Sequence, residues 1–178
     1  MKKLLLSFIL FAIFSSAQAQ KPLFLTLEGD SGMFEDSLQN GFLMEDLSWA
    51  WNSSNACFVS FQQKKFSGNH KLYVVDLPAY TEMEVTLVPN DKNANMSLYA
   101  YQVGQIAENT IVPNLPSSIR CEADFKWDRP RVGKTQNHTR TVSNLVAIRN
   151  PYKLVIGVAG ADGLKAGSYK LQIKKVGK

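Results

Sequence analysis

The sequence predicts an all-β fold of antiparallel strands, arranged as a β-sandwich or a barrel. Apolar and polar residues alternate in several segments, and a period of two places successive side chains on opposite faces of a strand. Turn-forming residues separate these segments where hairpins need them, at 67–69, at Pro78 and at 89–95. Short strands at this spacing are typical of antiparallel sandwiches and barrels.

The first nineteen residues, "MKKLLLSFILFAIFSSAQA", have the three-part pattern of a secretory signal peptide. Two lysines precede an apolar block, which ends at a small-residue cleavage site before Gln20. No later segment approaches the roughly 20 apolar residues that a spanning helix needs. We therefore expect an exported protein, periplasmic or extracellular, without a membrane span. The roughly 159 residues that follow fit a single domain.

Residues 20–56 are expected to form a strand and an irregular arm that packs on the sandwich. The stretch "PLFLTLEGD" reads as a short strand, with three leucines spaced two apart and a Gly-Asp ending. Residues 33–51 mix helical and strand spacings, so at most one helical turn is expected there.

Residues 57–178 are expected to form the sandwich itself. Strands are predicted, in chain order, at "CFVSF", "LYVVDL", "TEMEVTLV", "ANMSLYAY", "NLVAI", "YKLVIGV" and "GSYKLQIKK". In the last of these, Tyr169, Leu171 and Ile173 are predicted to face the core and their neighbours to face water. The proline-containing segment 105–141 is expected to be the least regular part.

Cys57 and Cys121 are the two cysteines of the chain. In an oxidising compartment such a pair more often forms a disulfide than two free thiols. A loop of about 65 residues corresponds to roughly 4 kcal/mol of stabilisation in the chain-entropy model, which is an upper figure. The disulfide would tie the irregular segment to the first predicted strand of the sandwich.

Four local motifs, taken in order, resemble the bacterial pre-peptidase C-terminal domain. They are "YVVDLPAYTEMEVTL", "ANMSLYAY", "NPYKLVIGVAG" and "AGSYKLQI", and together they cover roughly residues 57–176. The resemblance implies a small, jelly-roll-like β-sandwich of the kind appended to secreted peptidases. Some relatives are thought to bind calcium through aspartates at the start of one strand, where this chain has Asn93 and Asn95 with Asp91 nearby. Amides are poorer ligands for calcium than carboxylates, so no metal and no cofactor are expected.

Charge is unevenly distributed along the chain. The formal net charge is +5, and removal of Lys2 and Lys3 with the signal peptide leaves +3. Residues 20–56 carry one lysine against six acidic residues, a net of −5, so the remainder carries +8. The basic residues gather between 126 and 140 and include the candidate ligand-binding residues Lys126, Arg129, Arg131 and Lys134. Arginine can hold a carboxylate or phosphate in a bidentate manner, although a solvated loop that balances the acidic segment explains the same pattern.

Tyr99 and Tyr101 form the second candidate binding feature. If Met96, Leu98 and Ala100 face the core, the two tyrosines lie on the opposite face of the strand. They then either stack against a sugar or peptide, or pack against a neighbouring strand or the N-terminal arm.

No catalytic residues are predicted. His70 and His138 do not occur in a metal-binding spacing such as H-E-x-x-H, and the chain has no G-x-S-x-G motif. The expected function is therefore a non-catalytic exported binding or adhesion module. Its candidate partners are an acidic glycan or an envelope protein, with no nucleic acid. The alternatives are a small secreted hydrolase with an unrecognised site, and a partner or inhibitor of an exported peptidase.

Overall fold

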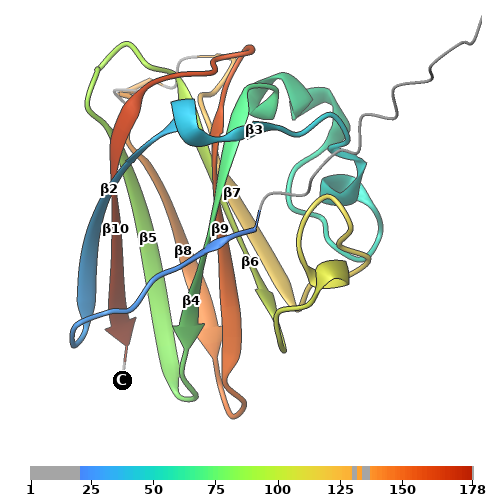
Figure 1. The fold of residues 1–178 in the computed structure, drawn as a ribbon, viewed down its shortest axis with the longest axis vertical. Coiled ribbons are helices and arrows are strands. Elements are labelled where there is room, and N and C mark those ends of the chain that lie inside the picture. The colour runs from blue at the N-terminus through green and yellow to red at the C-terminus, as the bar shows by residue number, and fades with distance from the viewer. Residues whose placement is uncertain (1–20, 130–131, 134–136, 178) are drawn as a thin grey trace, which may run out of the picture.

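The computed structural model describes residues 21–129, 132–133 and 137–177. Within these residues the chain forms two β-sheets that face each other, with a layer of short 3₁₀ helices and loops against the outer face of one sheet (Figure 1). No helix in the described residues is long and apolar enough to cross a membrane. The predicted signal peptide, residues 1–19, lies outside the described residues.

Eight strands form a jelly roll. One sheet has the order β2-β10-β5-β8, and the path β4-β9-β6-β7 runs through the other. The first strand of the roll pairs with the last, the second with the seventh, the third with the sixth, and the two middle strands with each other. This is the pairing of one long hairpin ribbon rolled up on itself. The strands are β2 (Ser31–Ser37), β4 (Asn69–Leu77), β5 (Thr81–Pro89), β6 (Met96–Val103), β7 (Arg120–Asp124), β8 (Arg140–Ala147), β9 (Tyr152–Gly160) and β10 (Ser168–Gly177).

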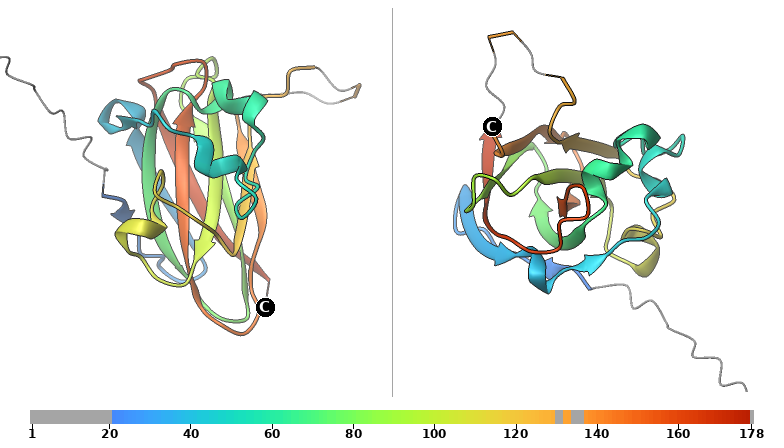
Figure 2. Two further views of the ribbon diagram at one scale, coloured as in Figure 1. Left: turned by 90° about the vertical axis from the view of Figure 1, so that its right-hand side faces the viewer. Right: turned by 90° about the horizontal axis from the view of Figure 1, so that it is seen from above.

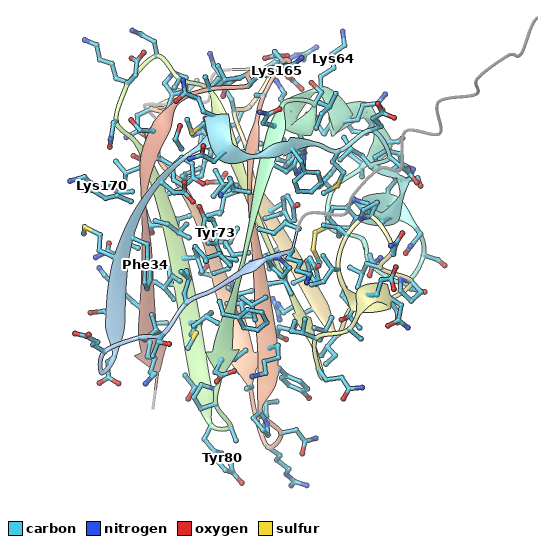
Figure 3. The ribbon with its side chains drawn as sticks, viewed as in Figure 1. Phe34, Lys64, Tyr73, Tyr80, Lys165 and Lys170 are labelled. Atoms are coloured by element: carbon cyan, nitrogen blue, oxygen red, sulfur yellow. A yellow bond between two sulfur atoms is a disulfide. The ribbon has the colours of Figure 1, made fainter. Side chains whose placement is uncertain are left out.

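The main hydrophobic core lies between the two sheets. Tyr169, Leu171 and Ile173 of β10 are fully buried in it, as the alternation predicted. Lys170 is exposed and points away from the sandwich, whereas Tyr73 points between the sheets (Figure 3). The predicted all-β sandwich of jelly-roll type is confirmed.

A second apolar cluster lies on the outer face of the sheet that contains β6. The segments that cover it include η2 (Ser48–Trp51), η3 (Ser60–Phe66) and the loop after β6 with η4 (Glu108–Thr110). Figure 2 shows these teal and yellow segments lying across the sheet. Because this layer shields the outer face, all eight residues of β6 are buried.

The N-terminal segment contributes strands to both sheets. β1 (Leu23–Phe24) pairs in parallel with β4, the chain then crosses to form the edge strand β2, and after η1 (Leu38–Asn40) it returns as β3 (Phe42–Leu43) beside β4. Most of β2 therefore lies within residues 33–51. The prediction that this segment is irregular was wrong for β2.

Two further predictions need correction. Residues 57–61 do not form a strand: Phe58 is buried, while Val59 and Phe61 are 49% and 78% exposed. The amide groups of Cys57 and Phe58 donate to the carbonyl oxygen of Ala50, so this segment is tied to η2 rather than to a sheet. Conversely, residues 120–124 in the supposedly irregular segment form β7, which pairs with β6.

The predicted disulfide between Cys57 and Cys121 is confirmed, with 4.8 Å between the two Cα atoms. It joins the segment after η2 to the edge strand β7 and so holds the covering layer against the sheet.

Candidate functional site

An open hollow of about 450 Å³ lies at the end of β7, where the chain enters the basic loop. Its lining includes Trp127, Asp128 and Arg129 of this loop, together with Phe125 and, from η3, Gln62. Arg129 is one of the basic residues that the sequence predicted as ligand-binding. The fold now places two aromatic rings, two carboxylates and an amide around the same space.

The carboxylate of Asp128 is held by two residues of η3. Lys65 Nζ lies 2.6 Å from Asp128 Oδ1, and Gln62 Nε2 donates to Asp128 Oδ2 over 3.2 Å. These hydrogen bonds, first from Lys65 and then from Gln62, lower the pKa of Asp128, so the carboxylate is charged at neutral pH. The loop is thereby anchored to the covering layer at the residue before Arg129.

The floor of the hollow is fixed by packing. Phe125 contacts Phe66 of the second cluster edge-to-face, with 5.7 Å between ring centroids. Asp124 accepts a hydrogen bond from the backbone N–H of Thr141 over 2.8 Å, which ties the end of β7 to β8. The hollow therefore sits on a rigid support, although its rim is a loop.

Of the charged residues that line the hollow, Arg129 is cationic and Asp124 and Asp128 are carboxylates. Lys126 and Arg129 are both exposed, and neither makes a hydrogen bond or ion pair with the described residues. Nearby, burial together with the charges of Arg140 and Lys126 lowers the pKa of His138. The other two basic residues of the predicted set, Arg131 and Lys134, lie outside the described residues.

Tyr99 and Tyr101 do not form a binding surface. Both side chains are fully buried beneath the covering layer, where they contact the ring of Trp49 at centroid distances of 5.3 and 6.1 Å. The hydroxyl of Tyr101 donates to the carbonyl oxygen of Thr110 and accepts from the N–H of Val112. The alternative in which these tyrosines pack against other segments of the chain is the one observed.

The two histidines also have structural surroundings. His70 is fully buried, with Nε2 2.7 Å from the carbonyl oxygen of Phe66 and Nδ1 3.2 Å from the Tyr99 hydroxyl. Since a carbonyl oxygen only accepts, Nε2 carries the proton and Nδ1 accepts from Tyr99. Burial lowers the pKa of His70 to about 4, so the ring is neutral at neutral pH.

A metal site would need several hard oxygen ligands or histidines in one place. Among the residues that the structure describes, no group of three His, Cys, Asp or Glu side chains is close enough to hold a metal ion. Asp91 Oδ1 accepts a hydrogen bond from the N–H of Asn93 over 2.8 Å and so closes the turn before β6.

Comparison with solved structures gives matches for the fold. The chain is similar to a pre-peptidase C-terminal domain. This domain, from a collagenase of Bacillus anthracis, aligns with a TM-score of 0.46 and 9% sequence identity, over 89% of this chain and 100% of that chain. A second match is Aeromonas hydrophila PliG, a periplasmic inhibitor of g-type lysozyme, with a TM-score of 0.39 and 10% identity over 87% and 96% of the two chains. No family model and no curated protein sequence matches.

Of the residues that line the hollow, only Arg129 was predicted from the sequence, and Trp127 and Gln62 are two that were missed. Trp127 lies between Lys126 and Arg129 in the string "KWDR", so an aromatic residue inside the basic cluster was a usable local signal. Gln62 carried no such signal, because it precedes Asp128 by 66 residues and meets it only through the fold.

Proposed function

We propose that the protein is an exported, non-catalytic binding module that holds an anionic group of an acidic glycan in the hollow beside Trp127 and Arg129. The observation that carries the proposal is the position of Arg129, which is exposed and unpaired among the described residues and lines the same hollow as an indole ring. Arginine offers paired donors to a carboxylate or sulfate, while an indole offers a flat surface to a sugar ring.

The shape of the hollow also supports a binding role. The hollow is open rather than enclosed, as suits one or two units of a longer chain entering from solvent. A volume of about 450 Å³ lies in the usual range for small-molecule sites.

The test uses tetragalacturonate as an acidic glycan and measures its binding by isothermal titration calorimetry. Raising the salt from about 0.01 to 0.15 M shortens the screening length from roughly 30 to 8 Å, so binding should weaken clearly. Arg129→Ala and Arg129→Ala with Arg131→Ala should weaken it further, and Trp127→Ala should weaken it at every salt concentration. Arg149→Ala is the matched control, because Arg149 is also exposed but lies in the β8–β9 turn.

Binding that is indifferent to Arg129 and Trp127 would contradict this site. Turnover of the glycan, lost on replacement of His138, would contradict the non-catalytic assignment and favour the hydrolase alternative.

A further inference from the structure

A second hollow lies on the covering layer, away from the basic loop. It has a volume of about 550 Å³ and is formed by two segments that are distant in sequence, η2 with the following residue and the loop 113–116. Trp51, Pro113, Leu115 and Pro116 supply its apolar surface. Trp51 is partly exposed, whereas Trp49 beside it is buried.

One buried side chain connects the two walls of this hollow. Asn55 is 6% exposed, and its Nδ2 donates to the carbonyl oxygens of Trp49 and Leu115 over 2.8 and 3.2 Å. Trp49 belongs to one wall and Leu115 to the other. The distance between the walls is therefore set by a hydrogen-bonded amide in the interior, and the hollow exists before any ligand arrives.

Trp51 is supported from the protein side. Its ring meets Phe58 edge-to-face, with 6.2 Å between centroids, and Phe58 in turn stacks on Phe66 at 3.8 Å. A ring held in this way loses little side-chain entropy when a ligand covers it, which lowers the cost of binding.

Polar side chains with unused hydrogen-bonding groups line the same hollow as Trp51. The side chain of Asn114 is exposed, lines the hollow and makes no hydrogen bond with the described residues. Ser48 also lines the hollow, but its hydroxyl is hydrogen-bonded to the carboxylate of Asp46. Asn52 accepts the N–H of Ser54 through Oδ1, which leaves its Nδ2 without a partner in the described part of the chain. None of the lining residues is charged.

From these features we propose that this hollow is a binding site for a neutral glycan, with one pyranose ring stacked on Trp51. The C–H face of a pyranose is apolar and fits an indole, whereas its rim of hydroxyls needs groups that both donate and accept, as side-chain amides do. The uncharged lining provides no cation for the acidic sugars assigned to the first hollow. The two sites therefore differ in ligand charge, and this inference does not rest on the first site.

An extended proline-rich peptide is the other occupant that aromatic-lined grooves accept. Such grooves hold proline rings between aromatic walls, but here one wall is itself Pro113, Leu115 and Pro116 and only one indole is partly exposed. A sugar ring on a single aromatic face, with amides at its edge, fits this arrangement better.

The experiment screens the protein against neutral hexasaccharides of glucose, xylose, mannose and N-acetylglucosamine, with a proline decapeptide as the competing ligand. Binding is followed by the ¹H–¹⁵N signal of the Trp51 indole, which is assigned from its loss in Trp51→Phe. We expect one or more sugars to shift this signal, with an affinity that is unchanged by salt. Trp51→Ala should abolish binding, and Asn114→Ala should weaken it about fivefold through loss of hydrogen bonds.

Asn114→Ala keeps the test decisive if Trp51→Ala perturbs the fold, since the Asn114 side chain is exposed and unbonded among the described residues. Asn109→Ala and Phe61→Ala are matched controls, because both residues are exposed and neither lines the hollow. Arg129→Ala should leave neutral-sugar binding unchanged.

Three results would overturn the proposal. The first is that no sugar shifts the signal at about 10 mM, a concentration high enough to detect weak single-site binding. The second is a shift with the proline peptide alone. The third is sugar binding that survives both Trp51→Ala and Asn114→Ala.

Discussion

The hydroxyl oxygens of Tyr73 and Tyr169 lie 2.6 Å apart in the core and form a hydrogen bond between the two sheets. Tyr73 belongs to β4 and Tyr169 to β10. The Tyr73 hydroxyl also donates to Asp36 Oδ2 over 2.8 Å, so Tyr169 is the donor to Tyr73. Lys71 Nζ lies 3.3 Å from the same carboxylate oxygen and completes a chain of four polar groups.

Removing either tyrosine hydroxyl from this row of polar groups should lower the free energy of unfolding, by a different amount for each tyrosine. Tyr169→Phe deletes one neutral hydrogen bond, and we expect it to lower the free energy of unfolding by about 1 kcal/mol. Tyr73→Phe deletes the bond to the carboxylate as well and leaves the Tyr169 hydroxyl without an acceptor, so a loss of about 2–3 kcal/mol is expected. Urea unfolding measures both. Tyr80→Phe is the control, since Tyr80 is 73% exposed at the tip of the β4–β5 turn (Figure 3), and it should be neutral. Equal losses for Tyr73 and Tyr169 would contradict this chain of donors.

Stability should fall when His70 is forced to protonate. Burial lowers the pKa of His70 to about 4 from an ordinary value of about 6.5. Below pH 6.5 the His70 ring is therefore protonated in the unfolded state while it is still neutral in the folded state. The contribution of neutral His70 to the free energy of unfolding is complete above pH 6.5 and is lost progressively as the pH falls towards 4. From these two pKa values the loss is on the order of 3 kcal/mol.

The measurement is the urea midpoint between pH 7.5 and 4.5. His70→Gln should have a lower urea midpoint than the wild type at pH 7.5, but its midpoint should change much less between pH 7.5 and 4.5. His138→Gln, at a partly buried position, should keep the wild-type change. A wild-type midpoint that is constant from pH 7.5 to 4.5 would show that His70 protonates freely in the folded protein.

The register of β10 predicts opposite outcomes for adjacent residues. Leu171 is fully buried in the main core, so Leu171→Asp must desolvate or protonate a carboxylate at a cost of several kcal/mol. Lys170 is exposed and lies 3.2 Å from Glu35 across the strand pair. Lys170→Asp replaces this weak ion pair by two like charges and should cost about 1 kcal/mol. Urea melts of equal midpoint would contradict the register.

The sequence was informative for β5 and β10, in which one face of the strand is buried and the other meets water. The alternation in β5 and β10 follows directly from one buried and one solvated face, and every second residue of β5 from Met83 to Leu87 is fully buried. β7 was missed because "RCEAD" is a short, mostly polar edge strand in which apolar and polar residues do not clearly alternate.

The covering layer explains most of what the sequence did not reveal. A strand that is buried on both faces loses the contrast between its two sides, and a pattern of spacing does not say which distant segment covers it. The spacing of Tyr99 and Tyr101 therefore left both alternatives open, an exposed binding surface or packing against another segment. The same holds for both hollows, where distant parts of the chain come together only in the fold: Gln62 bonds to Asp128, and Asn55 bonds to both Trp49 and Leu115.

Gly157 is the position at which the second apolar cluster should be most sensitive to substitution. It pairs directly with Tyr99 across the β6–β9 ladder, and the tyrosine ring lies over it. A Cβ atom at Gly157 would lie 2.0 Å from Cζ of Tyr99, far inside van der Waals contact. The ring has little room to move, because Trp49, Phe66 and His70 contact it from other sides.

Gly157→Ala should therefore destabilise the protein by about 3 kcal/mol or more, at the upper end of the usual cost of overpacking a core. Tyr99→Leu removes the ring that the new methyl group would strike and should itself cost stability. In the double variant the Gly157→Ala change should cost much less than it does alone, which is the sign of direct contact between the two positions. Gly104→Ala is the control, since a Cβ there meets no atom within 4 Å. Losses that add in the double variant would show that Tyr99 does not lie on Gly157. The four urea melts of this cycle thus test whether the covering layer holds the tyrosine flat on the sheet.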